Sequence, residues 1–166
     1  MPPSPSRAIY FRNFIFGGED SLVSTVGLLA GIAVGGVPRA DIVLTGIVLI
    51  FVEALSMAVG SFLSESSTEE YVAQAVVSAN MPIAGGVVMF FSYFFLGFIP
   101  LSPYIFIETP TAVWMSIIFS MISLGLLGVF SGREAKVSLG RSALKMIILG
   151  GAAILVGTVV GRLVRL

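Results

Sequence analysis

Two carboxylates and a thioether stand inside segments of the sequence that are otherwise almost purely apolar. Glu53 and Met57 lie four residues apart, directly after the apolar run DIVLTGIVLIFV, and Asp20 lies within an earlier apolar segment. If these segments cross a membrane, placing one ionised side chain at mid-bilayer costs between about 3 and more than 10 kcal/mol. Intramembrane acids are functional candidates by default, with protonated or hydrogen-bonded packing residues as the alternative.

Helical spacing groups each acid with small residues on one face. One stripe, at steps of 4, 3, 4 and 4, comprises Asp20, Ser24, Gly27, Gly31 and Gly35. A second stripe, at steps of 4, 3 and 4, comprises Glu53, Met57, Gly60 and Ser64. Glu19, beside Asp20, points about 100° away from the first stripe. Small residues let helix backbones approach closely, so both stripes are expected to face protein or a water-filled path. For the glycines, simple packing against the second predicted helix or a second copy of the chain is the alternative.

Oxygen and sulfur donors together indicate which ligand these side chains could bind. Magnesium and calcium prefer shells made only of oxygen, whereas a thioether is a softer ligand. A mixed path of Asp20, Glu53 and Met57 therefore favours a borderline transition cation such as iron(II) or manganese(II). Carboxylates can also exchange a metal ion for protons, which suggests antiport. The alternative for Met57 is packing, the usual use of methionine inside a protein.

Composition indicates a membrane protein and excludes several other classes. The chain has 166 residues, of which 57% are hydrophobic and only 11% charged, and its mean hydropathy is +1.05. Soluble domains carry about 25% charged residues. Nine basic and nine acidic residues give no net charge and no basic surface for nucleic acid. Since Cys and His are absent from the sequence, thiolate or imidazole metal sites and Cys or His catalysis are excluded, and we expect neither an enzyme nor a bound cofactor.

Five segments are long and apolar enough to cross a bilayer, which needs roughly 20 mainly apolar residues. They cover approximately residues 14–36, 42–64, 82–100, 111–130 and 142–163. Pro100, Pro103 and Pro110 are expected in the loop between the third and fourth segments, because proline cannot continue a helix. The sequence thus predicts an all-α membrane protein, a single domain of five transmembrane helices over residues 1–166. The N-terminal MPPSPSR lacks the pattern of a cleaved signal, so we expect it to remain in the mature protein.

The distribution of Lys and Arg predicts the orientation in the membrane. One side of the predicted membrane holds six basic residues, Arg7, Arg12, Arg133, Lys136, Arg141 and Lys145. The other side holds three, Arg39, Arg162 and Arg165. This bias predicts a cytoplasmic N-terminus and a C-terminus on the other side.

Helix rise allows the depth of the candidate ligands to be estimated. At about 1.5 Å per residue, Asp20 lies roughly 9 Å and Met57 roughly 10 Å into the membrane from the cytoplasmic side. Glu53 lies about 6 Å deeper than Met57. We therefore expect Asp20 and Met57 to meet at one level, with Glu53 as the next ligand outward.

Three further acids follow the second segment, in the stretch SESSTEEY. Glu65 and Glu69 are four residues apart on one helical face, and Glu70 is adjacent. One interpretation is a cation-attracting mouth at the cytoplasmic surface. The other is a solvated helix end.

The sequence resembles the vacuolar iron transporter family, also called the calcium cross-complementer family. Its two signature helices read approximately G-A-x-D-G-L-V-S/T-x-x-x-L-x-A-G and A-x-S-M-A-x-G-x-Y-x-x-x-x-S. They are similar to FGGEDSLVSTVGLLAGIAVGG and EALSMAVGSFLSESSTEEY in this chain. The later segments SYFFLGFIPLSPYIF, GLLGVFSGR and RSALKMIILGGAAILVGTVVGRLV are also similar, in the same order.

The resemblance implies five transmembrane helices, a homodimer in the lipid bilayer, and a metal path between the first and second helices of the two protomers. It implies export of iron(II) or manganese(II) from the cytosol in exchange for protons. The membrane would be the plasma membrane in a prokaryote and the vacuolar membrane in a eukaryote. By position, Asp20 corresponds to the family's first-helix aspartate and Met57 to its second-helix methionine.

The chain departs from the iron-transporting members in two respects. Their second-helix glutamate lies two turns before the methionine, where this chain has Leu49, whereas Glu53 lies only one turn before Met57. They also insert a cytosolic metal-binding domain after the second helix. The corresponding stretch SESSTEEYVAQAVVSAN is long enough only for a helical extension and a turn, so the chain resembles short members without that domain.

Two other functions are compatible with a small membrane protein of this composition. A different proton-coupled transporter, with organic cations as cargo, would need an aromatic cage around an acid. The aromatic residues of the third segment, including Tyr93, are expected to lie away from both acids. A membrane scaffold without transport activity would have no use for Asp20 or Glu53.

Overall fold

The computed structural model describes residues 5–164 as five α-helices. In chain order these are α1 (Pro5–Val34), α2 (Arg39–Ala73), α3 (Asn80–Phe106), α4 (Thr109–Glu134) and α5 (Leu139–Val164). All five are long and apolar enough to cross a membrane, and the described residues contain no strand. The predicted fold class, an all-α membrane protein with five spanning helices, is confirmed. Arg165 and the first four residues of MPPSPSR lie outside the described residues.

The helices extend beyond the apolar segments of the sequence. α1 begins at Pro5 and α2 continues to Ala73, where Gln74 ends it in the left-handed conformation with φ 50°. A helix satisfies its own backbone hydrogen bonds in water as well as in lipid, whereas hydropathy detects only the part inside the bilayer. The helical extension and short turn expected after the second segment are therefore present, as the end of α2 and residues 74–79.

Two prolines expected in a loop lie inside α3. Pro100 and Pro103 are both buried within this helix, while Pro110 lies in the first turn of α4. Proline at position 103 removes the donor that would bond to the Ile99 carbonyl, and Ser102 Oγ donates to that oxygen instead, at 2.9 Å. Local side-chain donors thus let α3 continue to Phe106, as happens in membrane helices.

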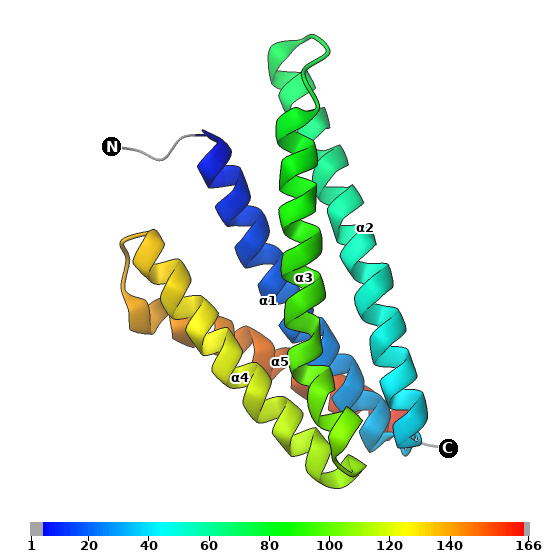
Figure 1. The fold of residues 1–166 in the computed structure, drawn as a ribbon. Helices are drawn as coiled ribbons and strands as arrows, with labels where there is room; N and C mark the ends of the chain where they lie inside the picture. The colour runs from blue at the N-terminus through cyan, green and yellow to red at the C-terminus, as the bar shows by residue number, and fades with distance from the viewer. Residues whose placement is uncertain (1–4, 165–166) are drawn as a thin grey trace.

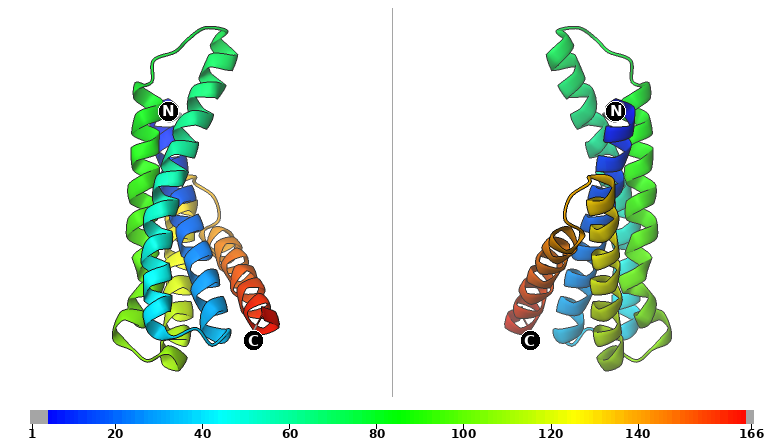
Figure 2. Two further views of the ribbon diagram at one scale, coloured as in Figure 1. Left: turned by 90° about the vertical axis from the view of Figure 1, so that its right-hand side faces the viewer. Right: turned by 90° about the vertical axis from the view of Figure 1, so that its left-hand side faces the viewer.

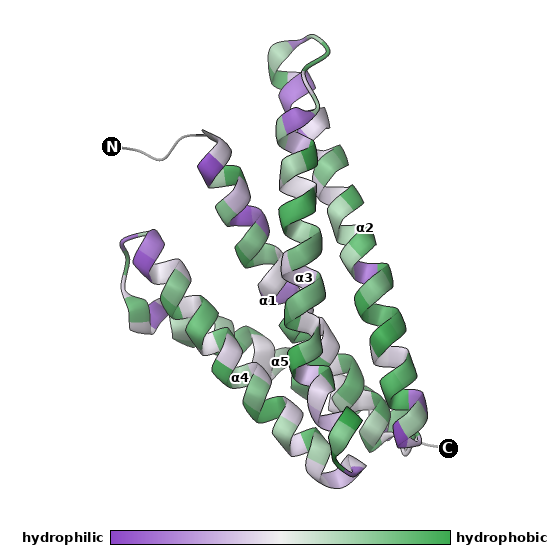
Figure 3. Ribbon diagram, in the orientation of Figure 1, coloured by the Kyte–Doolittle hydropathy of each residue, from purple (hydrophilic) through white to green (hydrophobic). Residues whose placement is uncertain are grey.

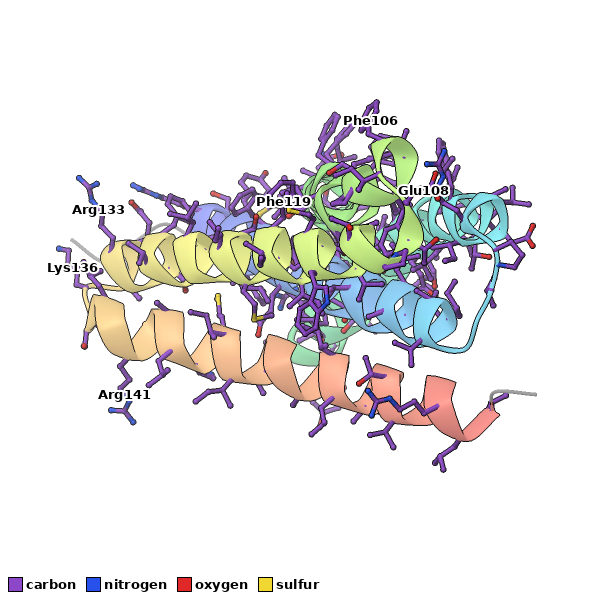
Figure 4. All side chains as sticks on the ribbon, turned by 90° about the horizontal axis from the view of Figure 1, so that it is seen from below. Phe106, Glu108, Phe119, Arg133, Lys136 and Arg141 are labelled. Atoms are coloured by element: carbon purple, nitrogen blue, oxygen red, sulfur yellow. The ribbon has the colours of Figure 1, made fainter. Side chains whose placement is uncertain are left out.

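The five helices have two common ends, which we name for the chain. The N-terminal end holds the start of α1 and the connections α2–α3 and α4–α5, and the opposite end holds the connections α1–α2 and α3–α4 (Figure 1). Basic residues Arg133, Lys136 and Arg141 surround the α4–α5 connection, whereas Phe106 and Glu108 lie toward the other end of α4 (Figure 4).

Helix α1 occupies the centre of the bundle, with α3 and α5 on opposite sides of it (Figure 2). Leu22 of α1 packs into one buried cluster with α4 and α5, and Leu29 packs into a second with α2 and α3. The outer faces of the helices are mostly apolar, as a lipid environment requires (Figure 3). Side chains near the middle of α1 therefore lie inside protein rather than in lipid.

The glycine stripe of α1 packs against α5, not against α2 or a second copy as the sequence suggested. A Cβ atom on Gly31 would lie 2.6 Å from the Gly157 carbonyl oxygen, and one on Gly27 would lie 3.1 Å from that of Ala153. The two backbones are thus in direct contact, as small residues permit in membrane helices. Helical spacing identified the face of close approach but not the helix that covers it.

Candidate functional site

Two contacts fix how α1 and α2 face each other. Near the N-terminal end, Ser61 Oγ donates a hydrogen bond to Asn13 Oδ1 at 3.0 Å. Toward the opposite end, Leu29 packs against Gly46, with its Cδ2 atom 3.2 Å from the place of a Cβ. Because the helices are antiparallel, interpolation between these contacts places Asp20 level with about residue 54 or 55 of α2.

Asp20 therefore lies at a level between Glu53 and Met57. Glu53 is about 2 Å and Met57 about 4 Å away along the helix axis, in opposite directions. The interpolation thus places Asp20 between the two α2 side chains, whereas the estimate from sequence placed it level with Met57, with Glu53 a full turn outward. The estimate from sequence assumed that both helices enter the membrane at the ends of their apolar segments, but both continue beyond them.

The carboxylates of Asp20 and Glu53 are close enough for their charges to interact. Both residues are partly buried between α1 and α2. Two carboxylates whose charges interact in a membrane-spanning bundle repel each other unless a cation or protons compensate their charge. The pair is therefore a suitable place for a cation that exchanges with protons.

Tyr93 of α3 reaches the same region. Its side chain is fully buried, its hydroxyl lies 2.8 Å from Ser24 Oγ in a hydrogen bond, and the charges of Asp20 and Glu53 both act on it. The expectation that the aromatic residues of the third segment lie away from both acids is thus wrong for Tyr93. Its neighbours Phe90 and Phe94 instead stack on each other, with ring centroids 5.7 Å apart. A single hydrogen-bonded tyrosine does not form an aromatic cage.

Met57 faces a cavity of about 830 Å³ between α1 and α2. The acid in its wall is Glu19, while neither Asp20 nor Glu53 lines it. Glu53 instead lines a second cavity of about 450 Å³, nearer the opposite end, together with Leu28 of α1. Glu53 and Met57, one turn apart on α2, thus face successive spaces along the same side of α1.

Sequence reasoning missed Glu19 as a candidate site residue. Its side chain points away from the stripe of Asp20, so the spacing around Asp20 alone does not indicate it. Another face of the first helix carries Arg12, Phe16 and Glu19 at steps of 4 and 3. This spacing could have revealed Glu19, since all three residues line the cavity of Met57.

The three acids after the second segment differ in their surroundings. Glu65 forms an ion pair with Arg12 of α1, so its charge is already compensated. Glu69 is partly buried and Glu70 is exposed, and residues 5–164 contain no ion-pair partner for either. Of the three, Glu69 and Glu70 are thus the better placed to attract a cation.

One chain alone does not assemble a complete shell of acidic ligands. Within residues 5–164, no three His, Cys, Asp or Glu side chains come together in a geometry that could hold a metal ion. A cation at Asp20 and Glu53 would need further ligands from neutral donors, from water or from a second copy of the chain. Neutral donors within reach of α1 and α2 include thioethers and hydroxyls.

Five spanning helices with a carboxylate pair between the first two define a polytopic membrane protein suited to binding cations. The model of the VIT family matches residues 11–79 and 74–162, which together cover nearly the whole chain. The protein belongs to the VIT family, as one of its short members. This is a family of transporters rather than of enzymes, and it assigns the chain to membrane transport of metal ions in general. No curated protein matches the chain.

Proposed function

We propose that the protein exports a divalent transition cation, iron(II) or manganese(II), from the cytosol in exchange for protons. The observation that carries this proposal is the pair of Asp20 and Glu53, whose charges interact between α1 and α2. A divalent cation neutralises both carboxylates at once, and protons can do the same. The two loaded states are therefore alternatives, which is the requirement for antiport.

Met57 supports the choice of a transition cation. Its side chain lies about 4 Å along the axis from the level of Asp20, facing the adjoining cavity. A thioether contributes little to binding magnesium or calcium, which prefer oxygen ligands. It binds iron(II) and manganese(II) more readily, and prefers the softer of the two.

A homodimer would complete the metal shell. Each protomer contributes two carboxylates and one thioether, and the residues around them leave apolar side chains uncovered. Phe16 of α1 is 52% exposed and Val52 of α2 is 58% exposed. Packing of a second copy on this side of α1 and α2 would bring the two sets of ligands together.

The direction of transport follows from the proposed orientation. With the N-terminus in the cytoplasm, the cavity of Met57 lies on the cytosolic side and that of Glu53 on the far side. Export proceeds from the first to the second. The membrane is the plasma membrane in a prokaryote and the vacuolar membrane in a eukaryote.

Transport by the purified protein in proteoliposomes tests this proposal. Iron(II), manganese(II) and zinc(II) are offered in turn, while an enclosed pH-sensitive dye reports proton movement. Asp20→Asn and Glu53→Gln should each nearly abolish metal flux and the coupled proton flux, because the amides keep the shape but lose the compensating charge.

Asp41→Asn is the matched control. Asp41 is exposed in the first turn of α2, at the opposite end from the cavity of Met57. This variant should transport like the wild type. If Glu53→Gln transported metal normally, or metal moved without any proton countermovement, the proposal would be wrong.

A further inference from the structure

We propose that the cavity between α1 and α2 is a second binding site for the transported cation, with Glu19 as its carboxylate ligand. This inference rests on the proposed function. It adds a site on the N-terminal side of Asp20 and Glu53, where a cation is captured before it reaches them.

The walls of the cavity carry the donor types that a transition cation requires. Its volume of about 830 Å³ is far larger than one ion, so the ion can enter with water. The sulfur donors in the wall are Met57 and Met89, and its polar side chains are Arg12, Asn13, Glu19, Ser56, Ser61 and Ser64. The charge of Arg12 is compensated by its ion pair with Glu65. One carboxylate with hydroxyls, an amide and thioethers matches a borderline cation better than calcium or magnesium.

Glu19 has no close partner of its own. The residues 5–164 offer its carboxylate no hydrogen bond and no ion pair, although the side chain is partly buried. The positive charge that acts on it belongs to Lys145 of α5, beyond ion-pair distance. A partly buried carboxylate without a partner is costly, and a bound cation would remove that cost.

Asn13 supplies an amide oxygen at the cavity wall. Its side chain is only 1% exposed, its Oδ1 accepts the hydrogen bond from Ser61, and its Nδ2 has no partner. Nδ2 lies beside Gly85 of α3, so the atom that Asn13 offers to the cavity is Oδ1.

The position of the cavity suits a relay. Glu19 precedes Asp20 in α1, and the charges of the two carboxylates interact. Met57 belongs to the cavity and lies one turn from Glu53. A cation can therefore pass from Glu19 to the pair of Asp20 and Glu53 while it keeps contact with one ligand of each helix.

The test compares Glu19→Gln with Lys145→Met in the full-length protein, with Mn²⁺ as the probe. Initial flux is measured against Mn²⁺ concentration on the N-terminal side, and binding to the purified protein is measured by the paramagnetic signal of free Mn²⁺. Glu19→Gln should raise KM about tenfold, as expected for one lost charged ligand. Its kcat should change little, and it should bind fewer Mn²⁺ ions at saturation than the wild type.

Lys145→Met separates a cation site from a simple charge pair. If Glu19 binds the cation, removal of the competing ammonium lowers KM. If Glu19 acts only as the electrostatic partner of Lys145, both substitutions raise KM for Mn²⁺ or reduce flux to the same extent, and the inference is overturned.

Two other results would also overturn the inference. One contradicts the second site alone, and the other contradicts the proposed transport function as well. A Glu19→Gln protein with the KM and the Mn²⁺ stoichiometry of an active wild type contradicts only the second site. A wild type that neither binds nor transports Mn²⁺ or iron(II) contradicts the proposed function as well.

Discussion

Arg12 of α1 and Glu65 of α2 form an ion pair beside the cavity that Glu19 and Met57 line. Arg12 itself belongs to the wall of this cavity, so a fixed positive charge stands where a cation would enter. The pair joins two helices that the chain connects only at the opposite end. It can therefore influence both the entry of a cation and the spacing of the helices.

The first prediction concerns this charge. Arg12→Gln should lower KM for Mn²⁺ several-fold, because it removes repulsion at the entrance, measured as initial flux in proteoliposomes. Stability should fall by about 1–3 kcal/mol, since the Glu65 side chain is only 10% exposed and loses its charged partner. Arg7→Gln is the control, because Arg7 pairs with Glu134 and does not line the cavity. Equal KM values for the two variants would contradict the prediction.

The second prediction concerns the thioether. Met57→Leu keeps volume and apolarity, so the free energy of unfolding should change by less than about 1.5 kcal/mol. Flux should fall less than in the acid variants, and the ratio of iron(II) to manganese(II) flux should decrease, because iron(II) is the softer ion. Met146→Leu, in the buried cluster of α4 and α5, should leave this ratio unchanged. A silent Met57→Leu would indicate a packing residue.

The third prediction concerns Tyr93. Tyr93→Phe removes the hydroxyl that forms a hydrogen bond with Ser24 and on which the charges of Asp20 and Glu53 act. We expect a loss of about 1 kcal/mol of stability and a several-fold slower flux. Tyr104→Phe is matched in burial but lies in the cluster around Leu29, so it should not slow transport. Measurement of flux at saturating Mn²⁺ distinguishes the two, and equal rates would show that the Tyr93 hydroxyl has no part in transport.

The fourth prediction tests the packing of α1 on α5. Gly157→Ala places a methyl group against the backbone of Gly27, whereas Gly151→Ala, in the same helix, meets open space. Overpacking of this kind typically costs about 1–3 kcal/mol, so only Gly157→Ala should lower the thermal unfolding midpoint in detergent. Similar midpoints for both variants would mean that α5 does not pack this closely on α1.

The fifth prediction is topological. The six-to-three distribution of Lys and Arg predicts that the N-terminus is cytoplasmic. Five spanning helices then place the C-terminus on the other side. A C-terminal reporter enzyme that is active only outside the cytoplasm should be active, and one that is active only in the cytoplasm should not. The reverse pattern would require the transport direction to be reassigned.

Hydropathy was sufficient to predict five spanning helices, because a bilayer demands long apolar segments wherever the chain crosses it. Helical spacing also identified the faces that carry Asp20 and Glu53. It could not identify the helix that covers each face. Along α1, Ser24 meets α3 whereas Gly31 meets α5, although both belong to one stripe. Helices that cross at an angle exchange neighbours along their length, and a one-dimensional pattern does not record the angle.

Other parts of the candidate site depend on contacts between helices that are far apart in the sequence, and residue spacing does not predict these contacts. Glu19 was missed because its face was judged relative to Asp20 alone, whereas the cavity is formed by residues from three helices. Tyr93 was missed because it lies in an aromatic run whose other members are partly exposed, and only its own side chain is fully buried. In both cases the third helix, far away in the sequence, completes the surroundings.

The direct backbone contact between α1 and α5 restricts how the protein can move. A rotation of α1 about its axis would replace Gly27 and Gly31 at this contact by Leu28 and Ile32, for whose side chains the α5 backbone leaves no room. We therefore expect these two helices to move together. α2 is joined directly to α1 by residues 35–38, where Gly36 adopts a φ of 94°. A swing of α2 about this hinge gives the greatest displacement at the N-terminal end, where it would open the path to water.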